Sequence, residues 1–278
     1  MDIKEGKITT SDGLFLNWKG WLPEQKPKAL VHIMHGYAEH IDRYQNLVNE
    51  LVPAGIAICG NNHRGHGRSD GKRGHVERFP EYIEDAKLFS EEVARNLLPD
   101  CPYFVLGHSM GSIIAMNFVE QYPERLAGLV LSGTGSLPGK DTGKTSLILA
   151  KIGSKLFPRL HIKFPLGPEF ISRDTEVVQA YIDDPLTYNV ITPRLADEIY
   201  VFLDKGSRNA GQIKLPVLVQ CGSEDISFSG QQQLVDTLGS TDKTFKLYQG
   251  LKHEVYNELP EDRDKVLSDL LTWLTAHI

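Results

Sequence analysis

The sequence predicts an α/β fold in which a mostly parallel sheet is covered by helices on both faces. Short apolar runs alternate with longer segments of helical periodicity, and several of the runs end in glycine-rich loops. Parallel strands need crossover connections of this kind, because each strand must return in the same direction. The 278 residues suffice for one sizeable domain with an insertion.

The chain is expected to begin with a β-hairpin. Leu14, Leu16 and Trp18 alternate with more polar neighbours after a Ser-Asp-Gly turn sequence at 11–13. This period of two is typical of half-exposed strands.

Six apolar runs after Pro27 are the predicted strands of the parallel part. Their continuous apolar character is typical of strands that are buried on both faces. They lie at Ala29–Met34, Ile56–Cys59, Tyr103–Leu106, Leu126–Leu131, Val217–Cys221 and Phe245–Tyr248. Helices are predicted between and after them, at about 43–53, 80–97, 111–121, 230–239 and 261–276.

The rhythm of strands and helices stops from about Leu137 to Gly211, where no clear strand is expected. A stretch of that length is more typical of an insertion over one end of the sheet than of a loop. We therefore predict a core at 1–136 and 212–278 and a helical cap at 137–211, inserted after the sixth strand. Within the cap, Ser146–Leu156 is amphipathic, which is typical of a helix packed on the core and equally of an apolar, substrate-facing lid.

Composition and charge exclude several classes of protein. Hydrophobic residues make up 41% and charged residues 24%, and the net charge of −6 comes without a basic stripe, so a nucleic-acid partner is not expected. No apolar run approaches the roughly 18 residues of a membrane-spanning helix, and the opening residues lack a signal-peptide pattern. We expect a cytoplasmic protein without stable membrane insertion.

The three cysteines, Cys59, Cys101 and Cys221, are far apart and show no CxxC spacing. We expect buried, reduced thiols. His63 and His66 lack the helical spacing and the carboxylate that a zinc site would need. No metal and no cofactor are predicted.

The strongest motif is Gly107-His108-Ser109-Met110-Gly111, between a predicted strand and a helical pattern. A serine between two glycines at a strand-to-helix corner occupies a strained turn, and its hydroxyl projects at the carboxyl edge of the sheet. The N-terminus of the following helix adds backbone N–H groups and the positive end of its dipole. This placement predicts that Ser109 is a nucleophile.

A nucleophilic serine requires a base, and the base requires an orienting carboxylate. The loops after the last two predicted strands contain Glu224 and Asp225, then His253, and both leave the sheet edge that carries Ser109. With the acid before the base in chain order, Asp225 is the preferred acid and Glu224 the alternative. His253 is the predicted base, since the only other histidine after Asp225 is His277 beside the C-terminus.

Acyl transfer also needs donors for the developing oxyanion. The backbone N–H of Met110, which follows the nucleophile, is one predicted donor. The second is expected from the loop after the strand at Ala29–Met34, where the sequence reads His35-Gly36-Tyr37. We assign it to the N–H of Tyr37.

Several further motifs resemble a known family in order and spacing. They are His35-Gly36-Tyr37-Ala38-Glu39-His40 with Arg43-Tyr44, then His63-Arg64-Gly65-His66-Gly67-Arg68-Ser69, the Gly107–Gly111 elbow, Asp183-Asp184-Pro185-Leu186, and a tail from Asp242-Lys243-Thr244 through His253-Glu254 to Asn257-Glu258. With them the chain resembles the monoacylglycerol lipase and lysophospholipase group of the α/β-hydrolases over nearly its whole length. The resemblance implies the α/β-hydrolase fold, a Ser109–Asp225–His253 triad, a cap over the site and no cofactor.

The chain departs from the family pattern at three places. The family often has a second glycine where Ala38 stands and usually an aspartate at Asn62, and the residues 226–228 after Asp225 are less typical. Ala38 is expected to leave the backbone donor intact. Asn62 removes a carboxylate beside the His63–Ser69 loop.

The predicted activity is therefore carboxylic ester hydrolysis through an acyl-serine intermediate, and the resemblance points to monoacylglycerols as substrates. The insertion carries apolar residues compatible with a fatty-acyl tunnel, namely Leu147, Ile148, Leu149, Ile152, Leu156 and Phe157. Lysophospholipids and short esters remain open as substrates, as do an acyltransferase and a non-catalytic binder of an apolar ligand. Met110 differs from the Gly-Gly-Ser-Trp-Gly form of proline iminopeptidases, which disfavours a peptidase. The expected partner is a small lipid or ester, with transient contact between the cap and a lipid surface left open.

Overall fold

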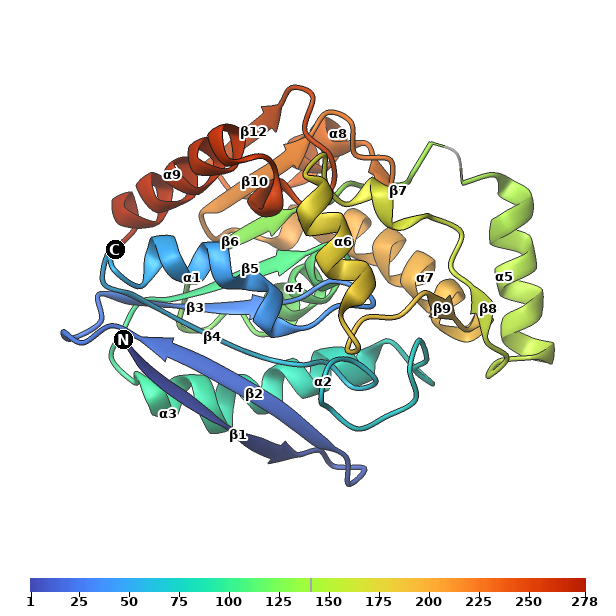
Figure 1. Ribbon diagram of the computed structural model, residues 1–278, viewed down its shortest axis with the longest axis horizontal. Coiled ribbons are helices and arrows are strands. Elements are labelled where there is room, and N and C mark those ends of the chain that lie inside the picture. The colour runs from blue at the N-terminus through green and yellow to red at the C-terminus, as the bar shows by residue number, and fades with distance from the viewer. Residues whose placement is uncertain (141) are drawn as a thin grey trace.

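A computed structural model describes residues 1–140 and 142–278. The molecule has a central sheet with helices on both faces and an additional helical layer at the carboxyl end of the parallel strands (Figure 1). The predicted fold class is confirmed. Within the described residues, no helix is long and apolar enough to cross a bilayer.

Eight strands form the central sheet in the order β1-β2-β4-β3-β5-β6-β10-β12. The predicted hairpin is confirmed as the antiparallel pair β1–β2, and β2 continues antiparallel to β4, whereas the six strands from β4 to β12 run parallel. The strands are β1 Asp2–Thr9, β2 Phe15–Leu22, β3 Ala29–Met34, β4 Ile56–Asn61, β5 Tyr103–His108, β6 Leu126–Ser132, β10 Val217–Gly222 and β12 Lys243–Tyr248.

The longer helices outside the predicted cap also lie where the sequence indicated. They are η1 Ile41–Tyr44 with α1 Gln45–Leu51, α2 Pro80–Phe89 with the π-helical turn η2 Ser90–Ala94 and α3 Arg95–Leu97, α4 Met110–Gln121, α8 Gln231–Thr237 and α9 Pro260–Ala276. The single helix predicted at 80–97 is therefore interrupted by a π-helical turn. Periodicity alone does not distinguish such a turn, because the apolar face continues through it. The short 3₁₀ helix η5 Val255–Asn257 was not predicted.

Alternation along the strands divides the apolar side chains between two cores. Val31 and Ile33 of β3 pack with α1 and α9 on one face, whereas Leu30 and Met34 pack with α2 and α4 on the other. Both faces of the inner strands are covered, which explains why these strands are mostly apolar. The polar loops at the carboxyl ends of the strands are thereby left at one edge of the sheet.

The predicted cap holds three longer helices, and it contains short strands that were not expected. The helices are α5 Lys144–Leu156, α6 Thr175–Asp183 and α7 Pro193–Asn209, with η3 Pro168–Phe170 and η4 Ala210–Gln212. The strands are β7 Leu137–Pro138, β8 Ile162–Lys163 and β9 Val190–Ile191; β7 pairs with β11 Phe228–Ser229 and β8 with β9. The prediction of no strand here was wrong, because a two-residue strand is too short to show a period.

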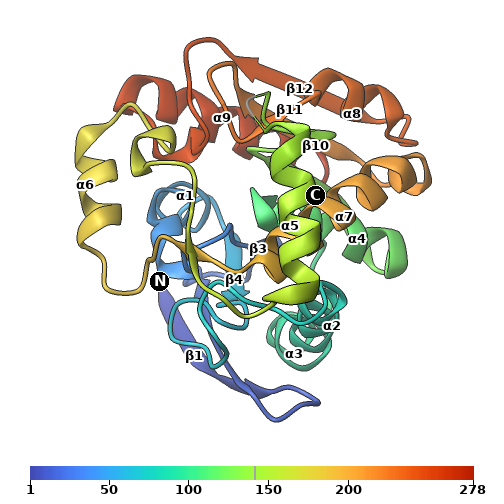
Figure 2. The ribbon, with the colours of Figure 1, turned by 90° about the vertical axis from the view of Figure 1, so that its right-hand side faces the viewer.

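The cap helices differ in how they meet the core. Figures 1 and 2 show α5 outermost, with α7 between it and α4. Leu195 and Leu203 of α7 are fully buried in the same core as α4. Part of α7 thus packs as a core helix although it lies within the predicted cap boundaries.

Candidate active site

Ser109 lies at the corner between β5 and α4 in a strained conformation, with φ 54° and ψ −122°. A non-glycine residue at positive φ is costly and persists only where the surroundings enforce it. Neighbouring glycines permit the turn: a Cβ on Gly107 would lie 2.5 Å from the Gly111 carbonyl, and one on Gly111 would clash with the Met34 carbonyl. The elbow predicted from the sequence is therefore present, with Ser109 lining a large cavity.

The predicted acid and base are in direct contact. His253 Nδ1 lies 2.8 Å from Asp225 Oδ2, and both side chains are almost completely buried. The other oxygen of Asp225 accepts a hydrogen bond from the Ser227 N–H at 2.8 Å. Glu224, the alternative acid, is exposed to solvent. The geometry therefore favours Asp225 over Glu224 as the partner of His253.

The charges of this pair stabilise each other. Burial alone would lower the pKa of His253, but the charge and hydrogen bond of Asp225, with Glu254 and Glu39, raise it above 6.5. Burial alone would raise the pKa of Asp225, yet His253 and the Ser227 N–H bring it below 3.8. His253 is packed against apolar rings, with centroid distances of 5.3 Å to Phe170 and 6.1 Å to Phe228. A base held in this way retains one ring orientation.

The loop after β3 carries Tyr37 beside Ser109. A Cβ on Gly36 would lie 3.1 Å from the Ser109 Cβ, so this loop touches the elbow directly. His35 Nδ1 lies 2.8 Å from the Gly36 carbonyl oxygen, and the His63 N–H donates to His35 Nε2 at 2.9 Å. Because Nε2 accepts this hydrogen bond, the neutral ring carries its proton on Nδ1, which donates to the Gly36 carbonyl. His35 therefore fixes the peptide plane that joins Gly36 to Tyr37.

By fixing the Gly36 carbonyl, His35 also fixes the direction of the Tyr37 N–H, one of the two predicted oxyanion donors. The carbonyl of Gly36 and the N–H of Tyr37 belong to one planar trans peptide and point in opposite directions. Burial lowers the pKa of His35 well below 6.5 and that of His63 to about 4, which keeps both rings neutral. The other predicted donor, the N–H of Met110, opens helix α4, and the Ser112 hydroxyl donates to the Ser109 carbonyl at 2.6 Å in the same turn.

A cavity of about 880 Å³ joins these groups to the cap. Ser109, Met110, Tyr37 and His253 lie on its wall. Its apolar lining comes mostly from the cap and includes Leu149, Ile162, Phe164, Leu166, Ile182 and Leu203. A pocket of this size and character fits a small ligand with a long apolar part.

The prediction for the apolar residues of the insertion was largely wrong. Of the six proposed for an acyl tunnel, only Leu149 lines the cavity. Ile148, Ile152, Leu156 and Phe157 are exposed to solvent. Helix α5 thus contributes to the cavity through Ser146, Leu149 and Ala150 and presents its other apolar side chains outward.

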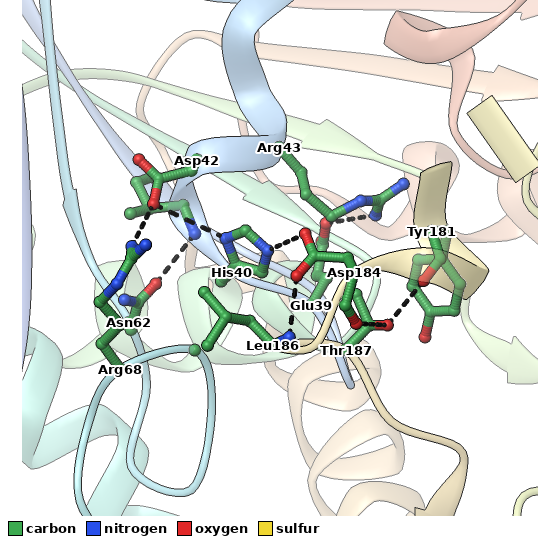
Figure 3. Close-up of polar contacts among 12 residues, drawn as sticks. Glu39, His40, Asp42, Arg43, Asn62, Arg68, Tyr181, Asp184, Leu186 and Thr187 are labelled. Atoms are coloured by element: carbon green, nitrogen blue, oxygen red, sulfur yellow. Dashed lines mark hydrogen bonds and ion pairs between the residues drawn. The ribbon is translucent and has the colours of Figure 1, made fainter. Parts of the chain in front are cut away.

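Four charged or polar residues around the site had no role in the sequence-based prediction. They are His35, Glu39, Arg43 and Glu254, and all four are buried or nearly so. Figure 3 shows Glu39 and Arg43 together with His40 and Asp184 between the β3 loop and the cap. The i, i+4 spacing of Glu39 and Arg43 was a usable signal for an ion pair.

The structure accounts for two departures from the family pattern. The amide oxygen of Asn62 accepts a hydrogen bond from the Ile41 N–H at 2.9 Å, so it supplies the acceptor that opens η1 without a carboxylate (Figure 3). Ala38 adopts φ 58°, a conformation that glycine would occupy with less strain.

The cysteines are free thiols, and Cys101 is half-buried rather than buried as expected because it lies in the loop before β5. Among the described residues, no group of three His, Cys, Asp or Glu side chains is arranged to hold a metal ion.

Comparison with known proteins identifies the family. The family model described as "Serine aminopeptidase, S33" matches residues 25–260. The chain belongs to this family. The S33-family chain is 35% identical over 269 residues to a monoacylglycerol lipase of Mycolicibacterium smegmatis, covering 96% of this chain and 95% of that one. It is 29% identical over 272 residues to the monoglyceride lipase of Homo sapiens, covering 96% and 89%.

A solved structure extends the likeness to three dimensions. The crystal structure of Paleococcus ferrophilus monoacylglycerol lipase superposes on this S33-family chain with a TM-score of 0.81 at 27% identity, over 100% of both chains. The predicted α/β-hydrolase fold and family resemblance are confirmed, and the chain is a hydrolase.

Proposed function

We propose that the protein is a serine hydrolase that releases fatty acid from monoacylglycerols, with Ser109, Asp225 and His253 as its catalytic triad. The observation that carries this proposal is the buried His253–Asp225 pair at 2.8 Å, whose histidine lies on the wall of the cavity that Ser109 lines. The relatives named above as monoacylglycerol lipases support the substrate class. The division into a core and a cap at 137–211 belongs to the same proposal.

The first half of the reaction acylates the serine. The Ser109 oxygen attacks the ester carbonyl while His253 takes the hydroxyl proton, and Asp225 stabilises the resulting imidazolium. The N–H groups of Tyr37 and Met110 hold the oxyanion of the tetrahedral intermediate. The intermediate collapses, the C–O bond to glycerol breaks, and His253 gives its proton to the leaving alcohol.

The second half returns the enzyme to its starting state. Water enters in place of glycerol, His253 removes one of its protons, and the hydroxide attacks the acyl carbonyl. The bond to Ser109 breaks as His253 returns the proton to the serine oxygen, and the fatty acid leaves. No other reactant is required.

A lipid surface is the proposed source of the substrate. Residues 142–168 contain five lysines and arginines and no aspartate or glutamate, while the rest of the chain has 25 basic and 36 acidic residues. The same segment exposes Ile148, Ile152, Leu156 and Phe157. A basic helix with an exposed apolar face is typical of segments that lie on anionic lipid surfaces.

Vesicle sedimentation tests this contact. We expect binding to vesicles of phosphatidylcholine with phosphatidylglycerol, weaker binding to phosphatidylcholine alone, and loss of the difference at high salt. Lys151→Glu with Lys155→Glu is expected to weaken binding, whereas Lys4→Glu with Lys7→Glu on the distant β1 is not. Equal effects of the two double variants would contradict the proposal.

A substrate panel tests the activity. The protein is assayed with a long-chain monoacylglycerol, a lysophospholipid, a short soluble ester and an aminoacyl anilide. We expect the highest kcat/KM with the monoacylglycerol and none with the anilide. Highest kcat/KM with the lysophospholipid or the short ester would replace the proposed substrate, and added alcohols that capture the acyl group would indicate an acyltransferase. Binding of the monoacylglycerol without turnover of any substrate would indicate a non-catalytic binder.

A further inference from the structure

A buried guanidinium links the loop that carries Tyr37 to the loop that carries His253. Arg43 Nη1 lies 2.8 Å from Glu39 Oε2 and 2.7 Å from Glu254 Oε1, and Nη2 lies 2.8 Å from Glu254 Oε2. The contact with Glu254 is bidentate, which fixes geometry as well as charge. The two carboxylates are 4% and 6% exposed, so these contacts are shielded from solvent.

The Glu39 end of this cluster holds the proposed oxyanion loop. Glu39 Oε1 accepts a hydrogen bond from the Gly36 N–H at 2.5 Å and another from the Tyr44 hydroxyl at 2.8 Å. Gly36 is thus held at its N–H by Glu39 and at its carbonyl by His35. A Cβ on Gly36 would lie 2.7 Å from Glu39 Oε1, so a residue larger than glycine would displace the carboxylate.

The Glu254 end holds the base. Glu254 directly follows His253, and its own N–H donates to the Ile171 carbonyl at 2.7 Å. Asn257 Nδ2 donates to Glu254 Oε2 at 2.8 Å. A shift of the Glu254 side chain would therefore move the backbone that carries the base.

The cap covers the same guanidinium. Figure 3 shows Arg43 and Tyr181 together, and the Arg43 guanidinium carbon lies 4.8 Å from the centroid of the Tyr181 ring. The Tyr181 hydroxyl donates to the Ala38 carbonyl at 3.3 Å. This cation–π contact excludes water from one side of the cluster. A desolvated ion cluster exerts a stronger field on its neighbours than an exposed one.

The cluster holds two carboxylates for one guanidinium. Burial raises the pKa of Glu39, but its three contacts are all donors, which favours the carboxylate form. Burial alone would raise the pKa of Glu254 too, yet the charge and hydrogen bonds of Arg43 lower this pKa to about 2. Both carboxylates line the cavity with His253. The charged or titratable groups that act on His253 are Asp225, Glu254, Glu39 and His108, and Arg43 contacts the two glutamates.

We propose that Glu39 and Glu254, joined by Arg43, are positioning residues that hold the oxyanion loop and the base loop in register and place net negative charge beside His253. The proposal rests on the proposed function of Ser109 and His253. None of the three side chains is required to touch the reacting atoms. Their role is to fix where two backbone segments meet and to favour the imidazolium that forms during the reaction.

The test compares Glu39→Gln and Glu254→Gln with Asp85→Asn, using a short soluble ester that needs little of the cap. Asp85 is a matched control, because it is a buried carboxylate bonded twice to a different guanidinium, Arg64, at 2.7 Å and 2.8 Å. We expect the two glutamate variants to lower kcat about 10- to 100-fold and to change KM less than about threefold. The acid limb of kcat/KM should move to lower pH by about half a unit or more. Asp85→Asn should lower the melting temperature without either effect.

A second readout separates this inference from the proposed activity. The pKa of His253 is measured by NMR on labelled protein, which requires no substrate, and circular dichroism establishes that each variant is folded. A lower His253 pKa in both glutamate variants supports the charge role even if no ester is hydrolysed, in which case the proposed function alone fails. Unchanged kcat and an unchanged His253 pKa in Glu254→Gln would overturn the inference. If Glu39→Gln fails to fold, Arg43→Lys replaces it, because lysine keeps the charge and loses the bidentate contact.

Discussion

His40 Nε2 lies 2.8 Å from Asp184 Oδ2 and thereby ties the loop after β3 to the end of cap helix α6 (Figure 3). Burial lowers the pKa of His40 although Asp184 opposes the shift, so the ring donates as a neutral imidazole near pH 7. Burial alone would raise the pKa of Asp184, but the hydrogen bonds from the Leu186 N–H and from His40 lower this pKa overall. The Asp184 carboxylate therefore stabilises the contact with His40 at pH values above its pKa in the unfolded chain. This contribution is lost as the pH falls through the lower pKa that Asp184 has in the folded protein.

Replacing Asp184 should loosen α6. We expect Asp184→Asn to lower the melting temperature by about 2–4 °C, the equivalent of about 1 kcal/mol, and to speed hydrogen exchange in Thr175–Asp183. Hydrogen-exchange mass spectrometry measures the second effect. Asp183→Asn is the control, because within the described residues the neighbouring carboxylate bonds only Gln179 on its own helix. Equal exchange rates in the two variants would contradict a role for the His40–Asp184 contact.

Removing His35 should impair the oxyanion loop without impairing substrate binding. We expect His35→Ala to lower kcat about 10- to 100-fold, less than or similar to the loss of an oxyanion donor, with KM nearly unchanged on a soluble ester. His32→Ala is the control, since His32 is equally buried, lies on β3 just before the loop that carries His35, and bonds Tyr103 instead. Steady-state kinetics of both variants distinguish a positioning role from general destabilisation, which should affect the two alike.

The pH dependence of the reaction should follow His253. Its pKa is raised above 6.5. As the pH drops through this raised pKa the imidazole becomes protonated, so kcat/KM should fall. Asp225→Asn should lower kcat about 10⁴-fold and move the acid limb to lower pH. Glu224→Gln, one residue earlier and exposed, should leave the pH profile unchanged. A pH profile altered by Glu224→Gln and not by Asp225→Asn would reverse the choice of acid.

The same pair gives a stability prediction with a defined sign. The raised pKa of His253 contributes stability below its unfolded value of 6.5, and this contribution is lost as the pH rises through the folded value. The lowered pKa of Asp225 contributes above its unfolded value of 3.8 and is lost as the pH falls through the folded value. The melting temperature of Asp225→Asn should therefore fall furthest below that of the wild type between pH 3.8 and pH 6.5, and the difference should be smaller at high pH. A deficit that grows with rising pH would contradict this assignment.

Close packing behind the elbow should make Gly111 intolerant of a methyl group. Its Cβ would clash with the carbonyl oxygens of Met34 and His35, which are fixed in or beside the sheet. We expect Gly111→Ala to lower the free energy of unfolding by about 3 kcal/mol. At Gly211 the nearest atom to a new Cβ within the described residues is the Thr237 carbonyl at 3.6 Å, so Gly211→Ala is the control. Urea unfolding of both variants measures the difference.

Much of the fold could be predicted because the inner parallel strands are buried on both faces and therefore appear as continuous apolar runs. Val217 to Gly222 is an example, since every residue of that strand is buried. The elbow could be predicted because its constraint is local: only glycines fit two positions before and two positions after Ser109. The acid and base followed from chain order, since each lies in a short loop directly after a strand.

The remainder depends on contacts between residues far apart in sequence. Glu254 pairs with Arg43 across 211 positions, and no local pattern indicates that their loops meet. Leu156 and Phe157 have the apolar character of cavity-lining residues, but they are 65% and 61% exposed because the orientation of α5 is set by its packing on α7. Periodicity defines an apolar face and does not determine what that face contacts.

The most direct test of the proposed activity is fatty-acid release from a long-chain monoacylglycerol by the wild-type protein and by Ser109→Ala. Loss of one triad member should reduce kcat about 10⁴-fold or more. The proposal predicts rapid release by the wild type and none above background by Ser109→Ala. Release that persists in Ser109→Ala would contradict the assignment of the nucleophile, and absence of release by the folded wild type would contradict the proposed substrate.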